Sequence, residues 1–174
     1  MYPLTTTTAR IDACNPCRDR RNRAANLLGI TEPSDQPISY EKLLDVLGLD
    51  DALWCCQAQP DLSPTWRRYA VWCARQAQHL MTDRRLLDAL DVAERHAAGD
   101  ATDQELSAAW DAATDAVCAA AGGAARAAGW AVACAVACAA GDAVCAVAWD
   151  AARAVARQQQ AAAFHQLVTT GTLP

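Results

Sequence analysis

Apolar side chains recur at helical spacing along most of this chain of 174 residues. The clearest stripe starts after Ser63 and Pro64, two residue types that are typical of a helix start. Six positions of the following segment share one helical face: they are Trp66, Tyr69, Ala70, Cys73, Ala77 and Leu80. The pattern predicts an amphipathic helix from Ser63 to Leu80.

Shorter apolar stripes, each bounded by capping or helix-breaking residues, predict further helices. Their expected spans are Asn15 to Leu28 before Gly29, Tyr40 to Leu47 between Ser39 and Gly48, Asp50 or Asp51 to about Gln59, and Thr82 to Ala97 before Gly99. Residues 1–8 are expected to be loosely attached, and residues 30–38 to form a loop. No stretch alternates apolar and polar residues in the manner of a strand, so no strand is predicted.

Residues 102–163 are dominated by alanine and contain no proline. Alanine has the highest intrinsic helix propensity, so the region is expected to be helical. Thr102 and Glu105 have the spacing of a capping box, which marks a new helix start. The pair Gly122 and Gly123 is the most favourable place for an interruption or a reversal.

One stripe of small residues follows the glycine pair, with steps of 4, 4, 3, 4 and 4 residues. Such steps keep all its members on one face of a helix. The stripe consists of Trp130, Cys134, Cys138, Gly141, Cys145 and Trp149. We expect it to be a helix-packing interface, either with residues 103–121 in a hairpin or with the same helix of a second copy in a homodimer.

These elements predict an all-α fold. A compact bundle of about five short helices is expected over residues 1–100, followed by long Ala-rich helices over residues 101–174 that pack as a hairpin or across a dimer. The formal net charge is -5, which disfavours generic nucleic-acid binding because that relies on basic residues. The uncharged stretch 127–141 is too short to span a membrane.

Charge is unevenly distributed. Residues 10–23 contain five arginines against two aspartates, whereas residues 32–61 contain seven acidic residues against Lys42 alone. The two regions either steer a charged protein partner or form two solvated helix faces. Residues 1–9 lack the pattern of a secretory signal. We therefore expect a cytoplasmic protein whose nine cysteines stay reduced, without structural disulfides.

The segment Cys14-Asn15-Pro16-Cys17 leaves three interpretations open. It could be a redox motif, half of a zinc site, or a pair of buried structural thiols. A zinc site would need further ligands, for which the candidates are Cys55, Cys56, Cys73 and His79. Cys73 and His79 lie on different helical faces and cannot form a nucleophilic pair. Without a recognisable catalytic set, we expect a protein that is not an enzyme and needs no cofactor.

Several segments together resemble a family of small helical proteins of phages, prophages and bacteria that are named as immunity proteins. The segments are residues 11–17, 48–55, 69–80 and 90–96, and the Ala-rich tail is also similar. The resemblance implies no catalytic residues. It implies a protein that binds and neutralises another protein, such as a toxin. By analogy of size and setting, small phage proteins of this kind also include inhibitors of bacterial defence systems such as CRISPR–Cas.

We therefore expect a non-enzymatic binding protein with an unidentified protein partner. The candidate partner-binding residues are in the acidic region: Asp45, Asp50, Asp51 and Trp54. Trp72 is a further aromatic candidate. The alternatives are a zinc-stabilised helical module that uses Cys14 and Cys17, and a structural homo-oligomer.

Overall fold

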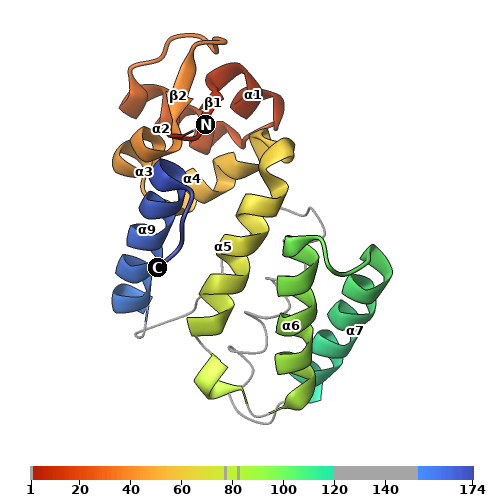
Figure 1. Ribbon diagram of the computed structural model, residues 1–174. Coiled ribbons are helices and arrows are strands. Elements are labelled where there is room, and N and C mark those ends of the chain that lie inside the picture. Colours follow the sequence, from red (N-terminus) through yellow and green to blue (C-terminus); the bar gives the residue numbers. More distant parts are fainter. Residues whose placement is uncertain (1, 77, 82, 120–152) are drawn as a thin grey trace. The chain divides into compact units, whose positions relative to one another are not determined.

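The computed structural model describes residues 2–76, 78–81, 83–119 and 153–174 (Figure 1). The fold is all-α, with one short two-stranded sheet. The chain divides into two compact units, of which unit 1 combines Met1–Pro60 with Arg157–Pro174 and unit 2 spans Asp61–Ala156. Each unit is described by itself below.

Unit 1 is built from short helices and ends with part of a long one. Its elements are β1 (Thr5–Thr7), α1 (Thr8–Ala13), α2 (Arg18–Leu28), β2 (Pro37–Ser39), α3 (Tyr40–Leu47), α4 (Leu49–Trp54), the 3-10 helix η1 (Cys55–Ala58) and, from Arg157 onward, α9 (Arg153–Thr170).

The small sheet corrects two sequence expectations, since residues 4–7 are held by backbone hydrogen bonds and a strand pair is present. β1 and β2 are antiparallel, with Thr6 opposite Ile38. The backbone N–H of Leu4 donates to the carbonyl of Val168 at 2.7 Å. The backbone N–H of Tyr40 donates to the carbonyl of Leu4 at 3.0 Å. The amino-terminal segment is therefore hydrogen-bonded to two distant parts of unit 1.

Helix ends in unit 1 mostly follow the local signals. The hydroxyl of Ser39 accepts a hydrogen bond from the backbone N–H of Lys42 at 3.1 Å, and this cap starts α3 as predicted. Gly29 adopts a left-handed conformation, with φ of 67°, and ends α2 as predicted. The predicted start of this helix at Asn15 was wrong, because Asn15 has a φ of 53° and lies in the connection before α2. The helix begins three residues later, at Arg18.

The core of unit 1 joins α3 to α9, which lie side by side (Figure 1). Four side chains at its centre are fully buried, namely Tyr40, Phe164, Leu167 and Val168. The rings of Tyr40 and Phe164 meet edge to face with their centroids 6.4 Å apart. Polar contacts flank this core, because Nε2 of His165 lies 3.1 Å from Oε1 of Glu41. Burial of each large apolar side chain contributes roughly 1.5–3 kcal/mol.

Unit 2 contains three longer helices and two short 3-10 turns. Its elements are η2 (Pro60–Leu62), α5 (Ser63–Gln76), η3 (Gln78–Leu80), α6 (Arg84–Ala98) and α7 (Asp103–Ala119). The helix predicted to reach Leu80 thus ends at Gln76. The next helix begins after Asp83, whose carboxylate accepts a hydrogen bond from the backbone N–H of Arg85 at 2.9 Å.

Helices α5, α6 and α7 share one core in which small residues are prominent. Leu86, Leu90 and Leu106 are buried in it. Alanines fill much of the remaining space, namely Ala89, Ala93, Ala109, Ala113 and Ala116. Because alanine side chains are short, neighbouring helices can approach closely.

The units do not coincide with the domains expected from the sequence. The expected boundary at residues 100 and 101 falls between α6 and α7, which share one core. Residues 157–174, expected to belong to the Ala-rich region, belong to unit 1. The glycine pair and the stripe from Trp130 to Trp149 lie outside the described residues. The packing interface and the homodimer therefore stay predictions.

Candidate functional site

A cavity of about 230 Å³ lies within unit 1, beneath α2. Its walls come from α1, α2, the loop after Gly29, α3, α4 and η1. Most of the lining is apolar, including Ile11, Ala25, Leu28, Ile30, Leu43 and Leu47. Concave and mainly apolar sites with a few polar groups are typical of ligand-binding pockets.

The cavity exists because α2 covers the unit without filling it. None of the 11 residues of α2 is buried. Its inner positions Ala24 and Ala25 have short side chains, so they line the cavity but leave its volume open. On the outer side, Leu27 is 50% exposed.

Ion pairs fix α2 to the rest of unit 1. Asp51 of α4 is only 7% exposed. Its Oδ1 lies 2.9 Å from Nε of Arg20, and its Oδ2 lies 3.3 Å from Nη1 of Arg23. The guanidinium carbon of Arg20 lies 4.9 Å from the centroid of the Trp54 ring, a cation–π arrangement.

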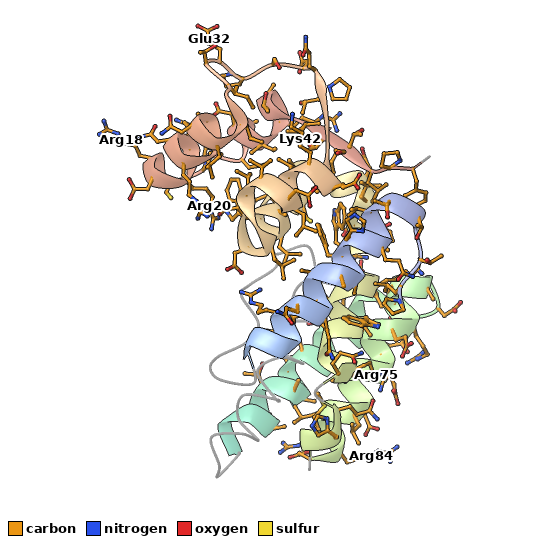
Figure 2. All side chains as sticks on the ribbon, turned by 90° about the vertical axis from the view of Figure 1, so that its left-hand side faces the viewer. Arg18, Arg20, Glu32, Lys42, Arg75 and Arg84 are labelled. Carbon is orange, nitrogen blue, oxygen red and sulfur yellow. The ribbon has the colours of Figure 1, made fainter. Side chains whose placement is uncertain are left out.

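A second ion pair joins α2 to α1. Nε of Arg21 lies 2.7 Å from Oδ1 of Asp12, and both residues line the cavity. Figure 2 shows Arg18 extending away from α2, whereas Arg20 lies on the side of α2 next to α3 and α4. The arginine-rich helix therefore has an inner face engaged with carboxylates and an outer face open to contact.

The four candidate partner-binding residues have different environments in the structure. The prediction that Asp51 contacts a partner is corrected, because its side chain is buried and ion-paired. Asp50 is exposed and forms an ion pair with Arg157. Trp54 is half-buried beneath Arg20. Asp45 is exposed, as that hypothesis required, and the aromatic candidate Trp72 is half-buried in unit 2.

Cys55 lines this cavity, and its side chain is buried. Burial, with a smaller contribution from Asp51, raises the pKa of Cys55 to about 12. Burial likewise raises the pKa of Tyr40 far above its ordinary value, and the Tyr40 hydroxyl donates to the carbonyl of Cys55 at 3.1 Å. Burial also raises the pKa of Cys14. A thiol with a raised pKa stays protonated at neutral pH and is a poor nucleophile.

The zinc candidates are divided between the two units. Cys14, exposed Cys17 and the buried pair Cys55 and Cys56 belong to unit 1, whereas Cys73 and His79 belong to unit 2. Across the described ranges, no group of three His, Cys, Asp or Glu side chains is arranged to hold a metal ion. The structure therefore offers no support for the zinc-stabilised alternative.

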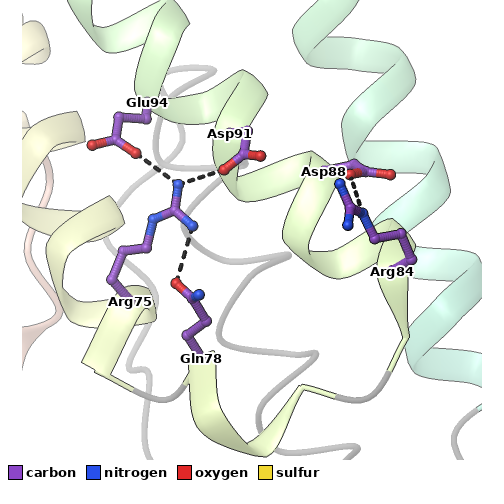
Figure 3. Close-up of polar contacts among 6 residues, drawn as sticks. All are labelled: Arg75, Gln78, Arg84, Asp88, Asp91 and Glu94. Carbon is purple, nitrogen blue, oxygen red and sulfur yellow. Dashed lines mark hydrogen bonds and ion pairs between the residues drawn. The ribbon is translucent and has the colours of Figure 1, made fainter.

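Arg75 is the centre of a polar cluster in unit 2 (Figure 3). Its Nη2 lies 2.6 Å from Oδ1 of Asp91 and 2.7 Å from Oε2 of Glu94. Its Nη1 donates to Oε1 of Gln78 at 3.1 Å. Burial opposes the charged form, but the bonds to Asp91 and Glu94 together raise the pKa of Arg75. The cluster fastens α5 to α6, which is a structural role.

His96 is a second polar junction of unit 2 and is 9% exposed. Its Nε2 lies 2.9 Å from Oδ1 of Asp103, and its Nδ1 lies 3.5 Å from Nη1 of Arg67. One side chain thus links α5, α6 and the start of α7. The sequence offered no signal for this junction, since its partners lie 29 and 7 residues away.

Sequence reasoning also missed Arg20 and Arg23 as site residues. Their spacing of three residues places them on one helical face, which is a local signal that was available. Their common partner, Asp51, becomes identifiable only when the chain folds.

Comparisons of the chain with protein-family models, with curated proteins and with solved structures found no match. The resemblance to immunity proteins consequently stays a prediction. In the part of the chain that the structure describes, no helix is both long enough and apolar enough to cross a membrane.

Proposed function

We propose that this chain is a non-enzymatic binding protein that recognises another protein through the outer face of α2. The observation that carries the proposal is that α2 is a regular helix of 11 residues with none of them buried. Most helical stability in proteins comes from packing of an apolar face. A helix that adds so little to the core of its own unit is available for contact with a partner.

The chemistry of the outer face suits an acidic partner. Arg18 is exposed and forms no ion pair with any described residue. Arg21 and Arg23 form their ion pairs on the inner face, but their side chains remain 50% and 62% exposed and still add positive charge near this surface. Leu27 adds an exposed apolar contact to this basic surface. Arginine is enriched at protein interfaces, and complementary charge steers encounter.

The state of the reactive groups supports a role without catalysis. The thiols of Cys14 and Cys55 have raised pKa values, which lowers their reactivity. Asp51, Asp91 and Glu94 are engaged in ion pairs with arginines that join helices. These groups support the fold, and none has the activation that a catalytic nucleophile or base requires.

The biological setting of the proposal rests on the sequence resemblance alone. In that setting, the protein acts in the cytoplasm of a bacterial host cell. It neutralises either a toxin or a component of a defence system such as CRISPR–Cas. The acidic candidate Asp45 is exposed and stays available to a partner. It is a secondary contact in this proposal, since α2 provides the principal surface.

The test uses the full chain as bait in bacterial lysate, with each captured protein then purified and titrated. Arg18→Glu and Leu27→Asp are each expected to weaken binding tenfold or more, or about 1.4 kcal/mol. Arg68→Glu is the matched control, because Arg68 is an exposed arginine of α5. Equal affinity of all three variants, or no saturable partner, would overturn the proposal.

A further inference from the structure

We infer that the cavity beneath α2 is a binding site for a small, uncharged, aromatic molecule. This inference concerns the inner face of α2 and is independent of the proposed function, which uses the outer face. It is argued below from the volume, the lining and the charge balance of the cavity.

The volume suits one or two fused rings. The cavity measures about 230 Å³. An engineered apolar cavity of about 150 Å³ in another protein stays free of water and binds benzene. The larger cavity here therefore has room for a bicyclic molecule such as indole.

The lining favours an apolar occupant. Leu43 and Leu47 are buried residues of α3, and Leu28 and Ala25 face them from α2. Solvent reaches this space, because the lining residues Asn22 and Thr31 are exposed, and an apolar occupant that displaces the water removes apolar surface from it. Ion pairs to Asp51 hold α2 in place over the space. An occupant would supply the packing that α2 itself does not.

The charges of the lining disfavour an anionic molecule, because the three carboxylates of Asp12, Glu32 and Asp51 outnumber the two arginines. The lining arginines Arg20 and Arg21 are already paired with Asp51 and Asp12. An anionic ligand would have to compete for Arg20 and would leave the buried carboxylate of Asp51 without part of its compensation. Unpaired buried charge is strongly unfavourable. A neutral ligand leaves both ion pairs intact.

Two polar side chains in the lining allow one hydrogen bond to the ligand. Asn22 and Thr31 line the cavity and are exposed, with no hydrogen-bond partner among the described residues. Either side chain can accept from an indole N–H or a phenol O–H. The ligand class is therefore a neutral aromatic ring system with one hydrogen-bonding group.

Indole is the probe for a titration of the full chain, followed by amide chemical shifts and calorimetry. Saturable binding with a Kd below about 1 mM is expected, with shifts concentrated at the lining residues of unit 1. Indole-3-acetate, which carries a negative charge, should bind at least tenfold more weakly. No saturable binding of indole would overturn the site, and equal affinity for the two probes would overturn the assignment to uncharged ligands.

Ala25→Phe fills the cavity and should weaken indole binding at least tenfold. Ala98→Phe is the matched control, because Ala98 is exposed on α6, and it should leave binding unchanged. If Ala25→Phe does not fold, Ala24→Leu fills less volume and should weaken binding at least threefold. Unaltered binding in the folded filling variant would overturn the location. The lysate test of the outer face gives its result separately from these titrations.

Discussion

At Asp51 one carboxylate compensates two arginines of α2. Its side chain is 9% exposed, whereas those of Arg20 and Arg23 are 32% and 62% exposed. The burial of the Asp51 carboxylate raises the free-energy cost of losing these ion pairs, whereas the exposure of the two arginines lowers it. Loss of a partner from a buried ion pair costs several kcal/mol, but solvent can rehydrate partly exposed arginines.

Replacement of Asp51 by Asn is expected to lower the free energy of unfolding by about 1–3 kcal/mol. Asparagine preserves the shape but not the charge that holds Arg20 and Arg23. Urea denaturation followed by circular dichroism measures the change. The matched control is Asp45→Asn on exposed α3 surface, which should change stability by less than about 0.5 kcal/mol. A change no larger than the control would show that the ion pair does not stabilise unit 1.

Cys55 and Tyr40 make the stability of unit 1 sensitive to high pH. Both groups are buried in their neutral forms, and burial raises both pKa values. The unfolded chain releases these protons first, since an ordinary cysteine has a pKa of 9.0. The folded state then binds more protons than the unfolded state, so stability falls as pH rises.

For Cys55 the loss is expected to begin near pH 9 and to continue through the folded pKa of about 12. Urea midpoints measured between pH 8 and pH 11 should therefore decrease. Cys55→Ala should make this decrease shallower, because it removes one of the titrating groups. Cys17→Ala is the control, since Cys17 is exposed. An identical slope in both variants would contradict the assignment to Cys55.

At the scale of elements, local signals determine where most helices start and stop. The capping box of α7 forms as predicted, because the hydroxyl of Thr102 accepts from the backbone N–H of Glu105 at 3.2 Å. The carboxylate of Glu105 accepts in return from the backbone N–H of Thr102 at 2.8 Å. This bond and a second one, donated by the Thr102 hydroxyl to the Glu105 carboxylate at 2.9 Å, lower the pKa of Glu105.

Replacement of Thr102 by Ala is expected to destabilise unit 2 by about 1 kcal/mol. The variant leaves a helix N–H without its cap and removes the donor of a hydrogen bond to Glu105. Thermal or chemical denaturation measures the loss. Gln104→Ala lies two residues further along, is equally exposed, and should have little effect. Equal stability of the two variants would contradict a stabilising cap.

Elements that depend on distant pairing were not predictable in this way. The strands β1 and β2 have three residues each, too few to display an alternating pattern. Thr6 is paired with Ile38 across more than thirty positions of sequence, and only the folded chain brings them together. The end of α5 at Gln76 was missed for a similar reason, because the apolar stripe continues into η3.

At the scale of the molecule, the two units have separate cores. The core of unit 1 includes Tyr40 from the first third of the chain and Phe164 from its end. The core of unit 2 is formed within residues 70–116. Since each unit buries its own apolar residues, damage to one core is expected to act mainly on that unit.

Replacement of Phe164 by Ala should destabilise unit 1 by about 3–5 kcal/mol, because it opens a cavity against Tyr40. Hydrogen exchange followed by mass spectrometry should show faster exchange in α3 and α4, with α6 and α7 unchanged. Leu90→Ala is the reciprocal control, as Leu90 is fully buried in unit 2. Uniform loss of protection across both units in each variant would contradict independent cores.

By itself, the sequence determined the all-α class, most helix boundaries and the capping box, because propensity and capping act over a few residues. It also identified Asp51 and Trp54 as candidates for partner contact, whereas the structure places both against Arg20 of α2. Only the tertiary structure decided that α9 packs on α3, that Asp51 is buried between two arginines, and that a cavity lies beneath α2. Each of these features joins residues that are distant along the chain, and their energies arise only after the intervening segments have folded.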